Sequence, residues 1–417
     1  MVKSKKTEKT ITRAFIERIP KTDLHLHLDG SLRISTLIDL AREYKVTLPS
    51  YTEEGLKKLV FKEKYASLNE YLQGFAYTTA VMKNEPSLER VAYELAIDNQ
   101  DEGVRYIEVR FAPQLHQHEH MTSASVLKAV NRGLLKAKNE FNSRPEIVSG
   151  SEPGFEYGII VCGMRMFGMG FSEYYDDMLR VLSHGDRRTI FSLASEELVR
   201  SAVKARDEFG LPIVGLDLAG AEDGFPADDH IKAFALAHKN FLKKTVHAGE
   251  AYGPESIFQA ITDCHADRIG HGYYLFERDM IHGNQIQDRQ AFINSLISFI
   301  ADRRITIEVC LTSNLQTNPM LKDLKDHSFS KMRDAKLSVS FCTDNRTVSM
   351  TSVSDEIEKA VNTFGITPRE LRHFVIYGFK RSFFPGAYAA KRQYVRKVID
   401  FYERIEAEFG IVEGEEQ

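Results

Sequence analysis

Short apolar runs rich in β-branched residues recur eight times along the chain, and most are followed by a segment with helical periodicity. Strands that alternate with helices predict a parallel sheet, and eight repeats favour its closure into a single (β/α)8 barrel of the TIM type. A doubly wound sheet would place a glycine-rich loop after the first strand, whereas residues 24–30 carry histidines. The expected strands are Lys21–Leu28, Arg105–Phe111, Tyr157–Cys162, Ile213–Leu218, Lys244–Ala248, Arg268–Gly270, Ile305–Cys310 and Leu337–Phe341.

Segments outside this alternation suggest the domain boundaries. We expect residues 1–14 to form a disordered basic tail and residues 15–417 to form one catalytic barrel domain. Within that domain, residues 141–154 and 276–304 are expected to be surface insertions. An amphipathic helix over residues 387–409 is expected to pack on the outside of the barrel.

The composition is that of an ordinary globular protein, since 43% of the 417 residues are hydrophobic and 27% are charged. A net charge of −4 gives no indication of a surface for nucleic acid or for anionic membranes. No apolar run reaches the roughly 18–20 residues that a membrane span needs. The cysteines are widely separated and form no C-x-x-C pair, so we expect free thiols in the reducing cytoplasm. They are Cys162, Cys264, Cys310 and Cys342.

Polar residues follow four of the expected strands, at the carboxyl ends where barrels of this kind carry their active sites. Any one of these residues alone is commonly a helix cap or a satisfied buried group. Two histidines that are two residues apart on a strand share one face, which suits a metal ion such as zinc. Four such strand ends in one barrel therefore predict a metal site. The residues are His25 and His27 at the end of the first strand, His247 at the end of the fifth and Glu250 just after it, His271 after the sixth and Asp344 after the eighth.

The remaining histidines are given no role from sequence. His116, His118 and His120 follow the second strand in a polar run without an apolar frame, so we interpret them as part of a solvated loop. The others stand in helical or loop contexts and comprise His184, His230, His238, His265, His282, His327 and His373.

Four motifs together resemble the adenosine deaminase family of the amidohydrolase barrels. They are His25-Leu-His27-Leu-Asp29-Gly30, His247-Ala-Gly-Glu250, Gly270-His271-Gly272 and Thr343-Asp344. Three further stretches are similar to the family, namely Tyr106 to Pro113, Asp217 to Gly220 and Thr312 to Asn314. The match follows the family order from about Ile19 to about Phe384. The resemblance implies a hydrolase that converts adenosine, and also 2′-deoxyadenosine, to inosine and ammonia, with a small purine nucleoside as its partner.

Carried over residue by residue, the resemblance implies one zinc ion per chain, held by His25, His27, His247 and Asp344. It implies that Glu250 donates a proton to purine N1, and that His271 orients and helps to deprotonate the zinc-bound water. The implied substrate contacts are those of His27, of Asp29 with the ribose hydroxyls, of the Gly220 backbone N–H with purine N3, and of an apolar lid formed by Tyr71, Leu72 and Phe75.

Elementary chemistry is consistent with these roles. Zinc lowers the pKa of a bound water from 15.7 to about 7 and so provides hydroxide at neutral pH. Addition of hydroxide to an aromatic ring also requires a proton on the ring nitrogen, which accepts the displaced electrons. Glu250 stands three residues after His247 and is placed to supply that proton.

One position departs from the common family pattern. Asn345 follows Asp344, where much of the family has a second Asp that contacts purine N7. N7 only accepts hydrogen bonds, and an Asn amide always carries a donor, whereas an Asp must first be protonated. The change therefore affects the details of base recognition, and Asn345 is expected to be the donor to N7.

Three alternatives remain open at the level of sequence. A binuclear hydrolase would use a carboxylated Lys at the end of the fourth strand, but that strand ends in Asp217-Leu-Ala-Gly220. A deaminase of adenine, AMP or an adenosine-like intermediate would use the same zinc chemistry, and Arg33 and Arg346 are the candidate cations for a phosphate. A binding protein that keeps the fold without turnover is the third, although no expected ligand or acid is missing.

Overall fold

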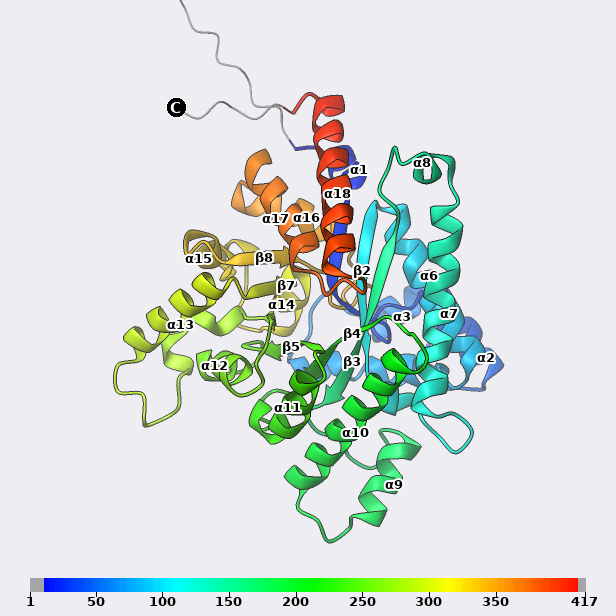
Figure 1. Cartoon of the computed structure of the whole chain (residues 1–417). Helices are drawn as coiled ribbons and strands as arrows, with labels where there is room; N and C mark the ends of the chain where they lie inside the picture. The colour runs from blue at the N-terminus through cyan, green and yellow to red at the C-terminus, as the bar shows by residue number, and fades with distance from the viewer. Residues whose placement is uncertain (1–10, 412–417) are drawn as a thin grey trace, which may run out of the picture.

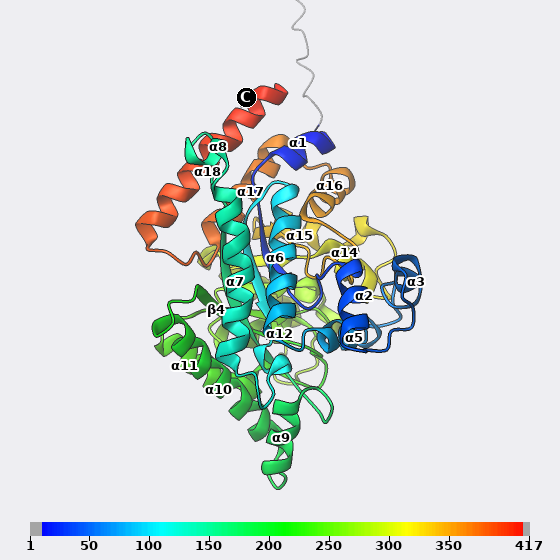
Figure 2. The ribbon, with the colours of Figure 1, turned by 90° about the vertical axis from the view of Figure 1, so that its right-hand side faces the viewer.

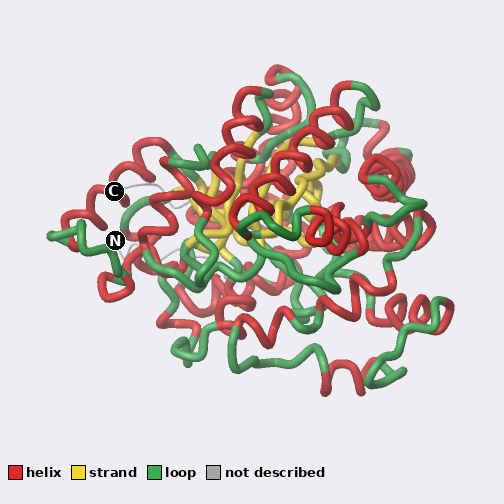
Figure 3. Tube along the Cα trace, turned by 90° about the horizontal axis from the view of Figure 1, so that it is seen from below, coloured by secondary structure: helices red, strands yellow, loops and turns green. Residues whose placement is uncertain are grey.

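The computed structural model describes residues 11–411, and its centre is a ring of eight parallel strands. Each strand pairs with the next along the chain, and helices surround the strands on all sides when the molecule is viewed along the barrel (Figure 3). The predicted (β/α)8 barrel is therefore confirmed, with every strand within two residues of its expected position. The strands are β1 (Lys21–His27), β2 (Val104–Phe111), β3 (Glu156–Met164), β4 (Ile213–Ala219), β5 (Lys243–Ala248), β6 (Arg268–His271), β7 (Thr306–Val309) and β8 (Ser338–Phe341).

A short parallel bridge between the first and last strands brings the two ends of the barrel together. Leu26 pairs with Asp344 just beyond the end of β8. The backbone N–H of His27 donates to the Asp344 carbonyl at 2.8 Å, and the Asp344 N–H donates to the His25 carbonyl at 2.8 Å. This closure places Asp344 beside two residues that are more than 300 positions earlier in the chain.

Helices occupy the connections between strands, and several begin at the residues that favour helix starts. Thr367 caps one of them with a complete capping box. The helices are α1 (Arg13–Arg18), α2 (Ile34–Glu43), α3 (Glu53–Leu59), α4 (Leu68–Leu72), α5 (Phe75–Val81), α6 (Glu85–Asp101), α7 (Ser123–Asn142), α8 (Pro145–Val148), α9 (Glu173–Val181), α10 (Arg187–Asp207), α11 (Ile231–Lys239), α12 (Pro254–Thr262), α13 (Arg289–Arg303), α14 (Leu311–Thr317), α15 (Phe329–Asp334), α16 (Val353–Phe364), α17 (Pro368–Arg381) and α18 (Tyr388–Phe409). Short 3-10 turns comprise η1 (Pro113–His116), η2 (Ala227–His230), η3 (Tyr273–Phe276), η4 (Arg278–Met280) and η5 (Leu324–Asp326).

The first and last helices lie together at the amino ends of the strands, the end opposite to the expected site (Figures 1 and 2). The Phe15 ring of α1 packs edge-on against Tyr402 and Phe409 of α18, with ring centroids 6.1 and 5.5 Å apart. The helix expected over residues 387–409 thus corresponds to α18. Of the expected tail, residues 1–10 lie outside the described residues, and residues 13 and 14 belong to helix α1.

The barrel interior beneath the expected site is charged rather than uniformly apolar. Two arginines and three carboxylates from β2, β4, β6 and β7 are all buried there. Arg110 contacts Asp217 and Glu308, each at 2.9 Å, and Arg268 contacts Glu308 at 2.6 Å and also Glu108. Such charges are tolerated in an interior only when they are paired, so this network constrains how the neighbouring strands can sit.

Candidate metal centre and active site

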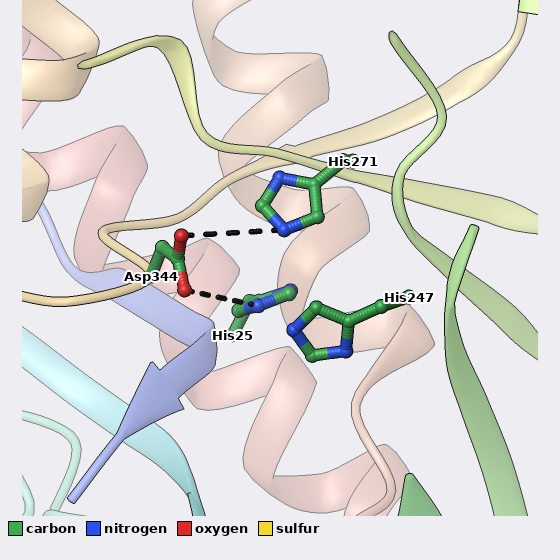
Figure 4. Close-up of side chains that lie close together, drawn as sticks. All are labelled: His25, His247, His271 and Asp344. Carbon is green, nitrogen blue, oxygen red and sulfur yellow. Dashed lines mark ion pairs between the residues drawn. The ribbon is translucent and has the colours of Figure 1, made fainter. Parts of the chain in front are cut away.

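The carboxyl ends of four strands bring histidine and carboxylate side chains into one buried cluster. Figure 4 shows His25, His247, His271 and Asp344 pointing toward a common centre. One possible ligand atom from each of these four residues lies within 4.8 Å of the others. His271 and Asp344 both have backbone φ angles in the left-handed region, at 65° and 61°. Non-glycine residues adopt that region at a cost, and such strain is typical of functional sites.

His27 lies closer to the centre of this cluster than His271 does. Its Nε2 is 3.1 Å from His247 Nε2 and 3.5 Å from Asp344 Oδ1, and His25 Nε2 is 3.4 Å from the same oxygen. The nearest approach of His271 Nε2 to Asp344 is 4.0 Å. Ligands at 2.0–2.1 Å from a tetrahedral zinc are separated by about 3.3–3.4 Å, so the set with His27 fits a zinc ion better.

Buried carboxylates orient two of these histidines. Glu308 Oε2 lies 2.9 Å from His25 Nδ1, and Asp217 Oδ2 lies 3.1 Å from His247 Nδ1. A carboxylate can only accept, so each Nδ1 carries the ring proton and each Nε2 presents a lone pair to the cluster. Histidines that bind metals are commonly held in this way. Within residues 11–411, His25 Nε2 has no hydrogen-bond partner although it is fully buried, which an ion at the centre of the cluster would explain.

Glu250 lies in the loop after β5 and is buried against the cluster. Its Oε1 is 3.6 Å from His271 Nε2. Burial raises the pKa of Glu250 to about 8. The negative charges of Asp344 and Glu222 also raise this pKa, whereas His247 lowers it. Burial therefore favours the protonated carboxyl group, which is the form that a proton donor needs.

A second buried carboxylate, not singled out from sequence, holds the loop that carries Glu250. The side chain of Glu222 accepts hydrogen bonds from four successive backbone N–H groups, at 2.8, 3.0, 2.6 and 2.9 Å. These belong to residues 249–252, and Ser256 donates to the same carboxylate from the start of α12. The only sequence signal was its position two residues after the Asp217–Gly220 stretch, in the loop that follows β4.

Two expected substrate contacts lie at neighbouring strand ends. Asp29 follows β1 and is buried. Its Oδ1 lies 4.0 Å from His27 Nδ1 and has no hydrogen-bond partner among the described residues. Gly220 follows β4 in the left-handed region with a φ of 103°, a conformation that glycine adopts without strain. Both residues lie at the carboxyl end of the barrel, and Asp29 is next to the histidine cluster.

The expected apolar lid is more polar than the sequence indicated. Tyr71 in α4 is buried, and its hydroxyl lies 2.8 Å from Ser349 Oγ and accepts from Asn345 Nδ2 at 2.8 Å. Leu72 and Phe75 are half-buried and pack against the core. Asn345 Oδ1 has no hydrogen-bond partner in the described part of the chain, and one N–H of the amide remains after the bond to Tyr71. Tyr71 is thus hydrogen-bonded to Asn345, the residue expected to contact the base.

The histidine run after β2 does not join the cluster, and its interpretation as a solvated loop is wrong for one member. His116 is buried in η1 against the ring of Phe111, whereas the side chain of His120 is 80% exposed. His118 lies at the surface, near the Lys83 carbonyl. The run is local in sequence, but the turn of η1 directs its first histidine inward.

Comparisons with known proteins agree with the geometry. The family model described as adenosine deaminase matches residues 20–401. A protein named adenosine deaminase 1 from Streptomyces coelicolor is 34% identical over 372 residues, which span 89% of this chain and 84% of that protein. The solved structure of the N6-methyl-AMP deaminase from Arabidopsis thaliana has a TM-score of 0.68 at 25% identity, covering 93% of this chain and 98% of that one. An amidohydrolase from Burkholderia ambifaria, solved with bound Zn, shares the fold with a TM-score of 0.74 at 19% identity over 97% of each chain.

Proposed function

The chain belongs to the adenosine deaminase family, and on this basis we propose that it is a zinc-dependent hydrolase that converts adenosine to inosine and ammonia. We expect 2′-deoxyadenosine to be a substrate as well. The observation that carries the proposal is the convergence of three imidazole nitrogens and one carboxylate beside the buried acid Glu250.

In this proposal, His25, His27, His247 and Asp344 hold one zinc ion. The 3.1–3.5 Å spacings of their ligand atoms and the carboxylates behind two of the imidazoles support this set. When bound, zinc lowers the pKa of a coordinated water to about 7. β4 ends without a lysine that could bridge a second metal, which favours one ion over two.

Glu250 serves as the proton donor to purine N1. Its burial favours the protonated carboxyl group, and the loop that carries it is held by Glu222. Asp29 accepts from the ribose hydroxyls, and its unpaired buried Oδ1 is available for that bond. The N–H of Gly220 meets purine N3, and the free N–H of Asn345 meets N7.

The substrate is a nucleoside rather than a nucleotide. Arg33, one candidate cation for a phosphate, pairs with Asp98 at 2.6 Å. Arg346, the other candidate, pairs with the buried carboxylate of Glu102. Because both guanidinium groups already have carboxylate partners, the structure offers no support for AMP through these residues, although the relative in Arabidopsis thaliana is named for a nucleotide.

Ammonia release from adenosine by the zinc-loaded protein tests the proposal. We expect turnover with adenosine and 2′-deoxyadenosine, and kcat/KM lower by on the order of 100-fold with adenine, which lacks the ribose hydroxyls, because an unmade hydrogen bond in a buried site costs about 1–3 kcal/mol. We expect a similarly low kcat/KM with AMP, because the two candidate cations for its phosphate are already paired with carboxylates. Removal of the metal with a chelator should abolish turnover, and zinc should restore it. Equal rates with AMP, or activity that needs two metal ions per chain, would contradict the proposal.

We also propose that the protein functions in the cytoplasm. All four cysteines are buried and unpaired, which suits a reducing compartment. Among residues 11–411, no helix combines the length and apolarity needed to cross a membrane.

A further inference from the structure

The Nδ1 atom of His271 has a different kind of partner from that of His25 and His247. In those two histidines, Nδ1 faces a carboxylate. In His271, Nδ1 lies 3.2 Å from the amide nitrogen of Asn314, in α14. A carboxylate only accepts hydrogen bonds, whereas an amide nitrogen only donates them. The two kinds of partner therefore require opposite positions for the ring proton.

The orientation of the Asn314 amide follows from a second histidine. Asn314 Oδ1 lies 3.1 Å from His327 Nε2. On the far side of the same ring, His327 Nδ1 accepts the backbone N–H of Phe329 at 2.9 Å. A backbone N–H can only donate, so the proton of a neutral His327 ring must be on Nε2, where it donates to Asn314 Oδ1. A flipped amide would bring its NH2 group against this N–H, so donor would face donor.

The surroundings of this chain of hydrogen bonds keep it intact. Asn314, His327 and His271 are each at most 1% exposed. Burial lowers the pKa of His327 to about 3, so its ring is neutral at physiological pH. Water cannot readily replace any partner, and an unmade hydrogen bond in such a place costs about 1–3 kcal/mol.

We propose that the hydrogen bonds from the Phe329 N–H through His327 and Asn314 hold His271 as the tautomer with its proton on Nε2. Asn314 and His327 are then positioning residues of the active site. The inference deepens the proposed function and rests on it for the identity of the reaction, but the position of the proton is a property of the protein alone.

This tautomer determines what His271 can do. Its Nε2 faces Glu250 Oε1 at 3.6 Å and Asp344 Oδ2 at 4.0 Å. A protonated Nε2 has no lone pair, so it cannot bind a metal, although distance alone groups His271 with the ligands. It donates a hydrogen bond into the site and orients the groups there. The resemblance led us to expect that His271 also helps to remove a proton, and this tautomer excludes that role at Nε2.

Nitrogen NMR of the zinc-loaded protein, with 15N in the histidine rings, tests the proposal directly. The signals of His271 are assigned by their loss in a His271→Gln variant. We expect the proton of His271 on Nε2 and a bare Nδ1, and the reverse arrangement in His25 and His247. A His271 proton on Nδ1 in the unaltered protein would overturn the proposal.

Replacement of Asn314 by Asp tests the cause of the tautomer. The carboxylate of Asn314→Asp still accepts from His327 but can no longer donate to His271, so the His271 proton should move to Nδ1. The kcat for adenosine should then fall on the order of 10- to 100-fold, because His271 Nε2 no longer donates its hydrogen bond to a charged group in the site. The KM should change little. Asn318→Asp makes the same chemical change at the end of the same helix, where Oδ1 accepts the Met320 N–H, and should leave the His271 tautomer unaltered.

The outcomes separate this inference from the proposed function. A His271 proton that stays on Nε2 in Asn314→Asp, or that moves in Asn318→Asp, would overturn the role of Asn314. A protein with the expected tautomers that releases no ammonia from adenosine would instead overturn the proposed function. If Asn314→Asp does not fold, the tautomer of the unaltered protein still decides the proposal.

Discussion

Glu250 carries the proton on which the proposed reaction depends, and its effect can be separated from metal binding at the scale of a single residue. Glu250→Gln keeps the shape of the side chain but cannot release a proton to the purine. We expect kcat to fall by about 10²–10⁴, the usual contribution of general acid catalysis, with zinc content unchanged. His247→Ala is the contrasting variant and should lose zinc. A Glu250→Gln protein with a nearly unaltered rate would remove the assigned role.

The role of Asn345 in base recognition can be tested by changing one atom of the substrate. If its free N–H donates to N7, then 7-deazaadenosine leaves that donor buried and unpaired, and kcat/KM falls by roughly 5- to 150-fold. The deaza ring also differs electronically, so both substrates must be compared in the unaltered protein and in Asn345→Ala. The gap between the substrates should shrink by about 1 kcal/mol or more in the variant. The same gap in both proteins would contradict a bond from Asn345 to N7, and would leave Asn345 only the role of holding Tyr71.

At the scale of elements, the loop between β5 and α12 depends on Glu222 in the loop after β4. Glu222→Gln keeps the size of the side chain but turns one acceptor into a donor against these N–H groups. We expect kcat to fall between roughly 10- and 100-fold, since a small displacement of Glu250 has effects of this size, while zinc is retained. The readouts are kcat and the zinc content.

Glu255→Gln provides a matched control for that experiment. The Glu255 carboxylate also accepts two backbone N–H groups, those of His282 and Gly283, but it braces a different loop. Its substitution should leave kcat nearly unaltered. Equal losses in both variants would show that any such change to a carboxylate that braces a loop disturbs the enzyme, and would contradict a specific role for Glu222.

At the scale of the whole molecule, buried neutral histidines make the fold sensitive to acid. Burial lowers the pKa of His116 from 6.5 to about 4. Between these values the unfolded chain binds a proton that the folded chain does not, so the free energy of unfolding decreases as the pH falls. Between pH 7 and pH 5 this one group accounts for about 2 kcal/mol.

His116→Leu removes this proton uptake, and denaturant unfolding at pH 7 and pH 5 measures the effect. The variant should lose about 2 kcal/mol less of its unfolding free energy than the unaltered protein does between the two values. His120→Leu is the control, because its side chain lies in solvent, and it should follow the unaltered protein. A His116→Leu protein with the same acid sensitivity as the control would contradict the burial argument.

The barrel was predictable from local patterns. The strands are short buried runs rich in β-branched residues, and the eightfold alternation with helices leaves few ways to close a sheet. The positions of His25, His27, His247 and Asp344 were predictable as well, since the carboxyl ends of parallel strands meet at one end of a barrel. The charged interior was harder to predict from the sequence. Glu108 and Arg110 are two residues apart on a strand and so share one face, but only the structure shows which charges lie opposite them.

Only the tertiary structure decided how the site residues are oriented. Local sequence shows that a histidine lies at a strand end, but the partner of its second nitrogen comes from another strand or helix. His25 depends on Glu308 in this way, and His271 depends on Asn314. His327 stood in an unremarkable loop and acquires its importance only because the fold places it between a backbone N–H and that amide. Hydrogen-bond direction depends on donor and acceptor geometry in space, and the order of residues along a chain does not encode it.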